Sequence, residues 1–270
     1  MSQEVLFERQ HDAFLPTPLA GSPWHPDLLH GGAPAGLLAH CLEQRVADAQ
    51  LLPGRFTLEL MRPVPSAPLQ VTFQTLRSGK RIRLECATLM AGGKPVAMAT
   101  ALFVAPAPVP VPAYAPQAAS PLPAVDSVRE INFRDVLSMG GGEVPPGLHT
   151  TVRLRAVTPL REQGQGVAWM QLPVDIVASA DTTPFMRAAL MSDFCNGVGQ
   201  LALDRSTGMI NADITLQLFR LPQSEWIGIE ARTLVQPTGV GMVQAALYDT
   251  EGMIGQVMQT AMPTGGLAQS

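Results

Sequence analysis

One carboxylate, Asp193, lies in the stretch AALMSDFCNGVGQLAL at 188–203, among residue types that are typical of a buried helix. Removing a carboxylate from water is unfavourable unless it gains a partner or performs a chemical task. No Lys or Arg lies within four positions of Asp193, so an ion pair along the helix is not available. On a helical projection Asp193 lies at the edge of the apolar stripe. We therefore predict that Asp193 is a general base beside a cleft, the alternative being a capping or ion-paired structural carboxylate.

Other residues capable of chemistry give weaker signals. Cys195 follows Asp193 by two positions, so on a helix it points about 200° away, and we interpret it as a packing residue. The five histidines form no i,i+4 pair with supporting acids, which argues against a metal site. His30 precedes Gly31 and Gly32, and it could fix the loop before a helix, contact a substrate or act as a base.

Two similar blocks of the chain must supply the sheet that positions these residues. The segments 55–104 and 210–262 both alternate like strands and contain turn signals. Arg62 aligns with Arg220 and Val71 with Ile229, each pair about 158 positions apart, which indicates an internal repeat. Each block is predicted to form an antiparallel meander of about four strands, because its connections are too short for parallel crossovers.

A helix-like apolar segment precedes each block, at 31–49 and 183–203, and strand-like sequence also lies at 151–157 and 166–174. The predicted fold class is α+β, with two tandem units in which one long helix covers an antiparallel sheet. A Pro/Ala-rich segment separates the units as a semi-rigid linker. The predicted divisions are an N-terminal unit (1–104), the linker (105–126) and a C-terminal unit with most of the site (127–270).

Composition narrows the classes of protein that fit. The net charge of −4 argues against a nucleic-acid binder. Three dispersed cysteines without a CxxC pair indicate reduced thiols. The N-terminal residues contain early acids and no apolar core of a signal peptide, and prolines interrupt the uncharged stretch at 95–125. We expect a cytoplasmic protein without a membrane span, and the open sheet edges favour a homodimer or a larger homo-oligomer.

Several fragments in order carry a family resemblance. They are HGG at 30–32, LRSGKRIRLECATL at 76–89, SDF at 192–194, NADITLQLFRLPQSEWI at 211–227 and GQVMQTAM at 255–262. Together they resemble the thioesterase-like superfamily of double hotdog acyl-CoA thioesterases, of the acyl-CoA thioesterase II type. The resemblance covers nearly the whole chain. It implies a double hotdog fold and hydrolysis of a fatty or related acyl-CoA to free acid and coenzyme A, without a metal, cofactor or covalent intermediate.

The same resemblance implies a set of site residues. An Asp in the second helix acts there with a hydroxyl residue and a Gln from two following strands, and these positions correspond to Asp193, Asn211 and Gln259. Asn211 departs from the pattern, since an amide cannot replace every function of a hydroxyl. Asn211 and Gln259 would hold the attacking water. His30, Gly31 and Gly32 would bind the substrate, with backbone N–H groups at the helix start stabilising the oxyanion.

Alternatives remain open at the level of the sequence. A non-catalytic acyl-CoA or lipid-binding protein on the same fold is one. A hydratase or dehydratase is another, which we disfavour because no His lies between Gln163 and Ser270. The first unit carries Ala39 and His40 where related enzymes carry an acid, so we expect one site per chain.

Two further groups have more than one interpretation. A basic cluster either meets the phosphates of coenzyme A or forms a solvated hairpin, and it comprises Arg77, Lys80, Arg81 and Arg83. The three tryptophans are predicted to be core residues or walls of an acyl tunnel, at Trp24, Trp169 and Trp226.

Overall fold

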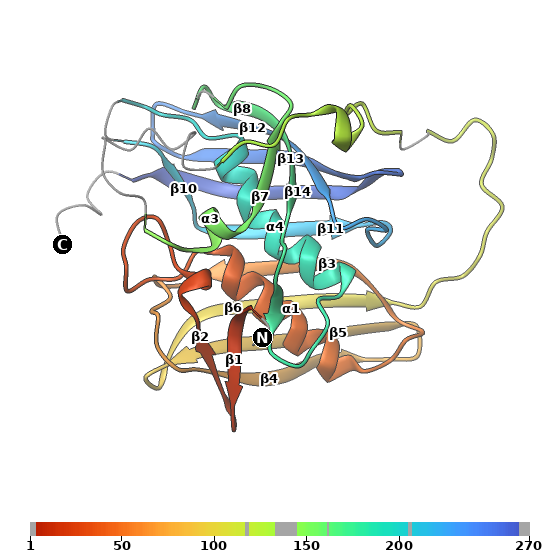
Figure 1. Ribbon diagram of the computed structural model, residues 1–270. Helices are drawn as coiled ribbons and strands as arrows, with labels where there is room; N and C mark the ends of the chain where they lie inside the picture. The colour runs from red at the N-terminus through yellow and green to blue at the C-terminus, as the bar shows by residue number, and fades with distance from the viewer. Residues whose placement is uncertain (1–3, 117–118, 133–144, 161, 205–206, 265–270) are drawn as a thin grey trace.

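The computed structural model describes residues 4–116, 119–132, 145–160, 162–204 and 207–264. These residues form one sheet of 14 strands, which curves around two long helices (Figure 1). The helices are α1 (Gly32–Val46) and α4 (Pro184–Val198), and they pack against each other in the middle of the molecule. The double hotdog α+β fold is therefore confirmed.

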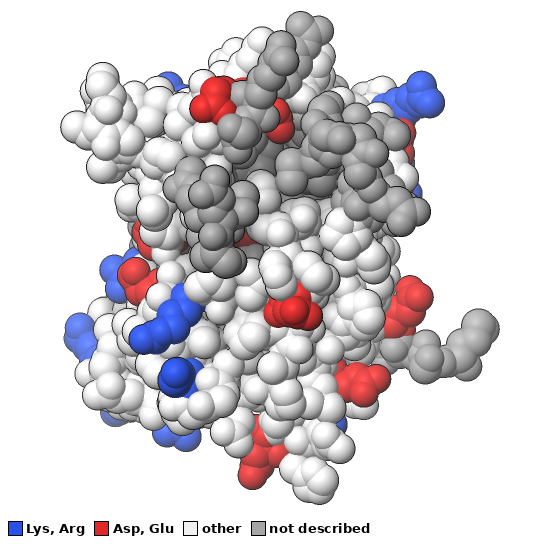
Figure 2. Space-filling model, turned by 90° about the vertical axis from the view of Figure 1, so that its left-hand side faces the viewer, with Lys and Arg blue, Asp and Glu red and all other residues white. Residues whose placement is uncertain are grey.

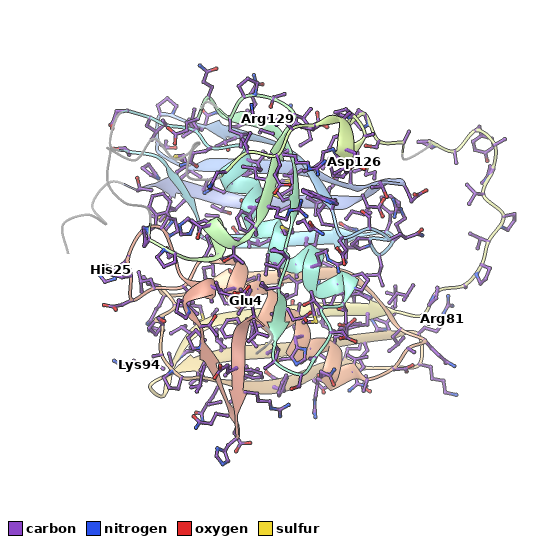
Figure 3. The ribbon with its side chains drawn as sticks, in the orientation of Figure 1. Glu4, His25, Arg81, Lys94, Asp126 and Arg129 are labelled. Atoms are coloured by element: carbon purple, nitrogen blue, oxygen red, sulfur yellow. The ribbon has the colours of Figure 1, made fainter. Side chains whose placement is uncertain are left out.

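The first repeat forms an antiparallel meander in the spatial order β3-β6-β5-β4, and a short hairpin follows β4 in the sheet. Its strands are β1 (Val5–Gln10), β2 (Ala13–Pro16), β3 (Leu52–Leu60), β4 (Leu69–Ser78), β5 (Ile82–Ala91) and β6 (Lys94–Val104). A 3-10 turn, η1 (Pro18–Ala20), leads from the hairpin toward α1. Figure 3 shows Arg81 and Lys94 at opposite ends of this meander, as expected for successive antiparallel turns.

The second repeat has the same arrangement, with the order β8-β12-β13-β14-β11 and β7 at the sheet edge. Its strands are β7 (Arg153–Ala156), β8 (Gln165–Gln171), β9 (Asp175–Val177), β10 (Met209–Asn211), β11 (Asp213–Leu218), β12 (Ile227–Val235), β13 (Gly241–Asp249) and β14 (Gly252–Pro263). Strand β9 leaves this unit and pairs in parallel with β1, while β10 pairs with β14. Two short turns precede β7, namely η2 (Val125–Ser127) and α3 (Leu148–Thr151).

The two meanders join through β11 and β3, which pair in antiparallel register with Thr215 opposite Thr57. This pairing makes the sheet continuous across the repeat. Between β6 and η2, the described residues of 105–124 form neither helix nor strand, and the segment runs along the outside of the molecule (Figure 1). Val109 and Tyr114 in this segment are 72% and 89% exposed, as expected for a chain without a core of its own.

Local sequence explains where the two helices begin and end. Thr183 caps α4 by accepting a hydrogen bond from the Met186 N–H, and Pro184 occupies the first helical position. Both helices end earlier than the predicted ranges, because α1 stops at Ala47 in the left-handed conformation and α4 stops at Gly199. The apolar residues after Gly199 belong to the following loop.

The tryptophans do not share one environment. Trp169 is buried, and Trp226 packs beneath Arg153 and Arg155. Trp24 is 56% exposed, so the prediction of a core or tunnel position is wrong for Trp24. Figure 2 shows one face on which Lys and Arg occur in small groups beside Asp and Glu, while most of that face is uncharged. Within the described part of the chain, no helix is both long enough and apolar enough to cross a membrane.

Candidate active site

The Asp193 carboxylate lies in the third turn of α4, where that helix meets the beginning of α1. The residue is 7% exposed. A Cβ atom at Gly31 would lie 2.6 Å from Asp193 Oδ1, so the carboxylate fills the space beside the α1 N-cap. The N-terminus of a helix favours a negative charge, because its first N–H groups point outward. Asp193 has no Lys or Arg near it in α4, and the positive end of the α1 dipole partly takes the place of such a cation.

Two side chains from distant parts of the chain contact the carboxylate. The Asn211 Nδ2 atom, at the end of β10, donates a hydrogen bond to Oδ1 at 2.9 Å. The Nδ1 atom of His30 lies 3.0 Å from Oδ2. The structure therefore brings His30, Gly31, Asp193 and Asn211 together, although they come from both repeats.

The His30 ring is held in one plane by its neighbours. It stacks on Phe194 with ring centroids 4.6 Å apart, and His149 lies on a nearly parallel plane at 6.4 Å. The Gly32 N–H also lies 3.2 Å from Nδ1, but Nδ1 cannot accept that proton and donate to Asp193 at once. A lone pair on Nδ1 would face the carboxylate oxygen unfavourably, so we assign the proton to Nδ1.

The other ring nitrogen of His30 is in a different position. Nε2 has no hydrogen-bond partner among the described residues, and it is not among their buried unpaired atoms. It is therefore open to solvent or to a bound molecule, while Nδ1 is held by Asp193.

Gln259 on β14 is 2% exposed and lies against the same turn of α4. Its Nε2 donates to the Ser192 carbonyl at 2.8 Å, which fixes the orientation of the amide. Its Oε1 is buried and accepts no hydrogen bond within the described part of the chain. The Oδ1 atom of Asn196, one turn after Asp193, is likewise buried and unpaired there, since its Nδ2 donates to the Met209 carbonyl. Buried acceptors of this kind are normally satisfied by water or a ligand.

The backbone at the start of α1 offers few free donors. The Ala33 and Ala35 N–H groups donate to carbonyls of the preceding residues, and Pro34 has no N–H. The Gly32 N–H points toward His30. Among the described residues, no acceptor binds the Gly31 N–H, and with the proton on His30 Nδ1 the Gly32 N–H has no acceptor either, so both can face a developing oxyanion.

Cys195 is fully buried, which confirms its interpretation as a packing residue. Burial, and then the nearby charge of Asp193, raise the pKa of its thiol. A thiol in this state is not a competent nucleophile.

The basic cluster lies at the other end of α1. Arg83 donates to Glu85 at 2.7 Å and reaches the carbonyls of Arg45 and Val46 at the C-terminus of the helix. A helix of 15 residues is about 22 Å long. The cluster is thus separated from Asp193 by about the length of α1, and at least Arg83 serves the helix end.

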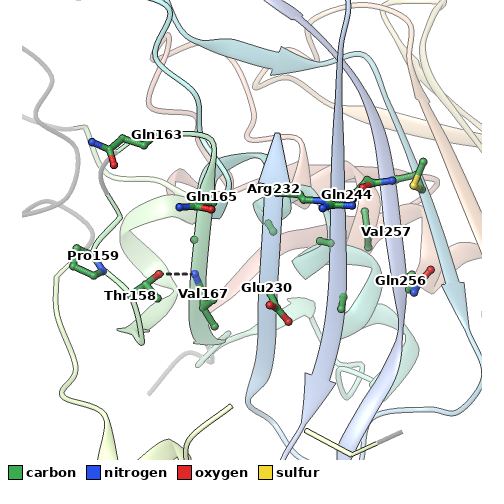
Figure 4. A pocket seen from close by; sticks show the side chains of 15 residues that line it. Thr158, Pro159, Gln163, Gln165, Val167, Glu230, Arg232, Gln244, Gln256 and Val257 are labelled. Carbon is green, nitrogen blue, oxygen red and sulfur yellow. Dashed lines mark hydrogen bonds between the residues drawn. The ribbon is translucent and has the colours of Figure 1, made fainter. Parts of the chain in front are cut away.

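A trough of about 880 Å³ lies on the outer face of the second meander (Figure 4). It is lined by strand residues such as Glu230, Arg232, Gln244 and Met258, whose neighbours in sequence face the core. Arg232 bonds Gln244 across the strands. None of the residues around Asp193 lines this trough, so it is separate from the candidate site.

Comparisons with known proteins identify the family of the chain. A family model described as the acyl-CoA thioesterase N-terminal domain matches residues 20–104, and one described as the C-terminal domain matches 116–262. The chain belongs to the acyl-CoA thioesterase family. It is accordingly a thioester hydrolase. No curated protein sequence matches the chain significantly.

Solved structures of similar fold support the family at the level of architecture. A thioesterase II from Thermobifida fusca has a TM-score of 0.71 at 14% identity, covering 96% of each chain. An acyl-CoA thioesterase II from Mycobacterium marinum has a TM-score of 0.65 at 13% identity, covering 95% of each chain. A dehydratase domain from Mycobacterium tuberculosis has a TM-score of 0.50 at 18% identity, covering 88% of this chain and 85% of its own. At these identities the similarities show the fold alone.

Proposed function

We propose that this thioesterase hydrolyses a fatty or related acyl-CoA to free acid and coenzyme A, using water activated at Asp193. The observation that carries the proposal is the position of Asp193, whose buried carboxylate lies against the α1 N-cap and is held by Asn211 and His30. A thioester carbonyl is electrophilic enough for direct attack by an oriented water. The site then has to supply a base, a fixed water and a donor for the oxyanion.

The remaining roles follow from which atoms are still free. Asn211 donates one of its two amide N–H bonds to the carboxylate, so we assign it to holding Asp193. The buried Oε1 of Gln259 has no donor among the described residues, so it would accept a hydrogen bond from the attacking water and hold that water in place. The free Gly31 N–H would stabilise the oxyanion.

The experiment is to incubate the protein with acyl-CoAs of increasing chain length and to follow the release of free thiol. We expect Asp193→Asn to lower kcat by about 100- to 10,000-fold, because the charge that activates water is lost. Asp213→Asn is the matched control, since Asp213 accepts the Thr260 N–H through an oxygen that asparagine retains. Tight binding of acyl-CoA without thiol release at any chain length would instead identify the non-catalytic protein.

A second candidate reaction is favoured by one specific contact. Hydration or dehydration of an acyl thioester needs an acid and a base in the same site. His30 and Asp193 could supply them, since Nδ1 of His30 lies 3.0 Å from Oδ2 of Asp193. The sequence disfavours this reaction because the helix of Asp193 carries no His, but in the structure His30 approaches Asp193 from outside that helix. Incubation with 3-hydroxyacyl-CoA tests it, because dehydration gives a conjugated enoyl thioester that absorbs ultraviolet light. Thiol release without that absorbance would exclude the second reaction.

A further inference from the structure

Two groups of the site can take the proton of the attacking water, Asp193 itself or the outer nitrogen of His30. We infer that Nε2 of His30 takes this proton, and that Asp193 acts through the ring. The inference rests on the proposed thioester hydrolysis and specifies its proton path. It changes His30 from a substrate-binding residue into the catalytic base.

The His30 ring is more accessible to a water molecule than the Asp193 carboxylate is. The Asp193 side chain is 6% exposed, and each of its oxygens already faces a donor, Asn211 for Oδ1 and His30 for Oδ2. Both oxygens of this carboxylate are therefore already paired with a donor inside the site. The His30 side chain is 15% exposed, and its Nε2 is free among the described residues. The available lone pair of the dyad is therefore on the ring.

Contacts with Asp193 and Phe194 also fix the orientation of the His30 ring. Asp193 binds Nδ1, so it selects the neutral tautomer that carries its proton on Nδ1 and its lone pair on Nε2. The stacked ring of Phe194 holds the imidazole plane. A buried carboxylate beside a neutral imidazole also stabilises the imidazolium that forms when the ring accepts a proton. Position, tautomer and charge all favour proton transfer to Nε2.

The balanced reaction has two steps. In the first, the water oxygen forms a bond to the thioester carbon, one water proton moves to the lone pair of Nε2, and the carbonyl π electrons move to oxygen. In the second, a lone pair of the oxyanion re-forms the carbonyl bond, the C–S bond breaks with its electron pair staying on sulfur, and the Nε2 proton neutralises the thiolate. His30 returns to its neutral form and Asp193 stays ionised throughout. The acid product then loses its own proton to solvent.

The decisive variant is His30→Asn. The Nδ2 atom of asparagine can occupy the place of Nδ1 and donate to Asp193, but asparagine has no atom at Nε2. If His30 is the base, kcat falls by about 100-fold or more while KM changes little. If His30 only positions Asp193, this variant keeps most of its activity. His25→Asn is the matched control, because His25 lies in the adjacent exposed loop and bonds the Asp27 N–H.

A second variant covers the case in which His30→Asn does not fold. His30→Ala removes the ring from a partly exposed position, and added imidazole should then restore part of the thiol release in a concentration-dependent manner. Activity in His30→Asn together with its loss in Asp193→Asn would overturn the inference and leave thioester hydrolysis standing. Failure of the unaltered protein to hydrolyse any acyl-CoA would overturn the proposed function itself. Absence of imidazole rescue in a folded, inactive His30→Ala variant would also contradict the inference.

Discussion

The Asp193 carboxylate in α4 and the Cα of Gly31, the N-cap of α1, are so close that a Cβ atom at Gly31 would lie 2.6 Å from Oδ1. Conformation is not the reason for glycine here, because Gly31 has φ −56° and ψ −28°, which any residue adopts. The reason is space. Gly31 of the first repeat has no side chain, and the Asp193 carboxylate of the second repeat occupies the space that such a side chain would fill.

Gly31→Ala is therefore expected to displace Asp193 rather than to strain the backbone. A shift of about 1 Å in a catalytic group can lower the rate by about 100-fold, so we expect kcat to fall by about 10- to 100-fold. Steady-state thiol release measures the effect. Full activity in this variant would show that the carboxylate need not lie against α1.

Gly197→Ala is the matched control on α4. Its Cβ would meet no atom within 4 Å, and the residue is exposed within the helix. We expect unchanged kcat and a gain of about 0.5–1 kcal/mol in the free energy of unfolding, because alanine restricts the unfolded chain and favours helix. A loss of activity in this control would attribute the Gly31→Ala effect to general disturbance of the helices.

Asn211 is expected to tolerate threonine but not valine. A threonine hydroxyl can donate to Asp193 as the Asn211 amide does, whereas valine has the same shape without a donor. We expect Asn211→Thr to keep kcat within about 10-fold and Asn211→Val to lose about 10- to 100-fold more, since one charge-assisted hydrogen bond contributes about 1.5–3 kcal/mol. Equal activity in the two variants would show that the hydrogen bond to Oδ1 is dispensable.

The sheet and the helices could be predicted because alternation and apolar runs are local properties of the chain. The meanders at 55–104 and 210–262 became β3 to β6 and β10 to β14. The helix ends could not be predicted as well, since the apolar residues after Gly199 continue the pattern while the backbone turns away. Asp193 can be selected as a candidate from the sequence, because a carboxylate without a nearby cation is unusual in an apolar helix.

The contact between His30 and Asp193 could not be predicted, because it depends on how α1 and α4 pack. The start of α1 meets the later turns of α4, and Glu43 near the end of α1 accepts a hydrogen bond from Thr183 at the start of α4. The helices are thus antiparallel, which brings together residues far apart in sequence. The same limitation applies to Asn211, whose hydrogen bond to the Asp193 carboxylate joins residues 18 positions apart. The roles of all these residues stay predictions.

The buried cysteines are expected to be unreactive in the folded protein. Burial raises the pKa of Cys41 to about 12, and burial also raises the pKa of Cys86 and Cys195. Only the thiolate reacts with thiol reagents, so the native protein should react slowly and the unfolded protein quickly. Cys195→Ala should keep its kcat, at the expense of a small cavity. Rapid inactivation of the native protein by a thiol reagent, absent in Cys195→Ala, would return Cys195 to the candidate nucleophiles.

The pair Asp249 and Arg220 is expected to dominate the loss of stability in acid. Two hydrogen bonds of 2.6 Å join the side chains, and the Asp249 side chain is fully buried. Burial alone would raise the pKa of Asp249, but hydrogen bonds from Arg220 and from the Gln223 and Glu251 N–H groups outweigh it, so the pKa is lowered. The folded-state pKa therefore lies below the unfolded-state value of about 3.9, and the stabilisation is complete above that value and lost as pH falls through the folded-state pKa.

Arg220→Met tests this assignment, because it leaves the Asp249 carboxylate buried without its cation. We expect the free energy of unfolding at neutral pH to fall by about 3–5 kcal/mol. The difference from the unaltered protein should shrink as the pH falls, because burial favours protonation of an Asp249 carboxyl that has lost its cation, whereas the unaltered protein loses its ion pair only at lower pH. Arg153→Met is the matched control, since Arg153 and Glu130 form an exposed pair that contributes at most about 1 kcal/mol. Denaturant titrations at several pH values measure both variants. A difference between Arg220→Met and the unaltered protein that stays constant from neutral pH to acid would contradict the assignment, because a pH-independent loss reflects packing of the Arg220 stem rather than the charge on Asp249.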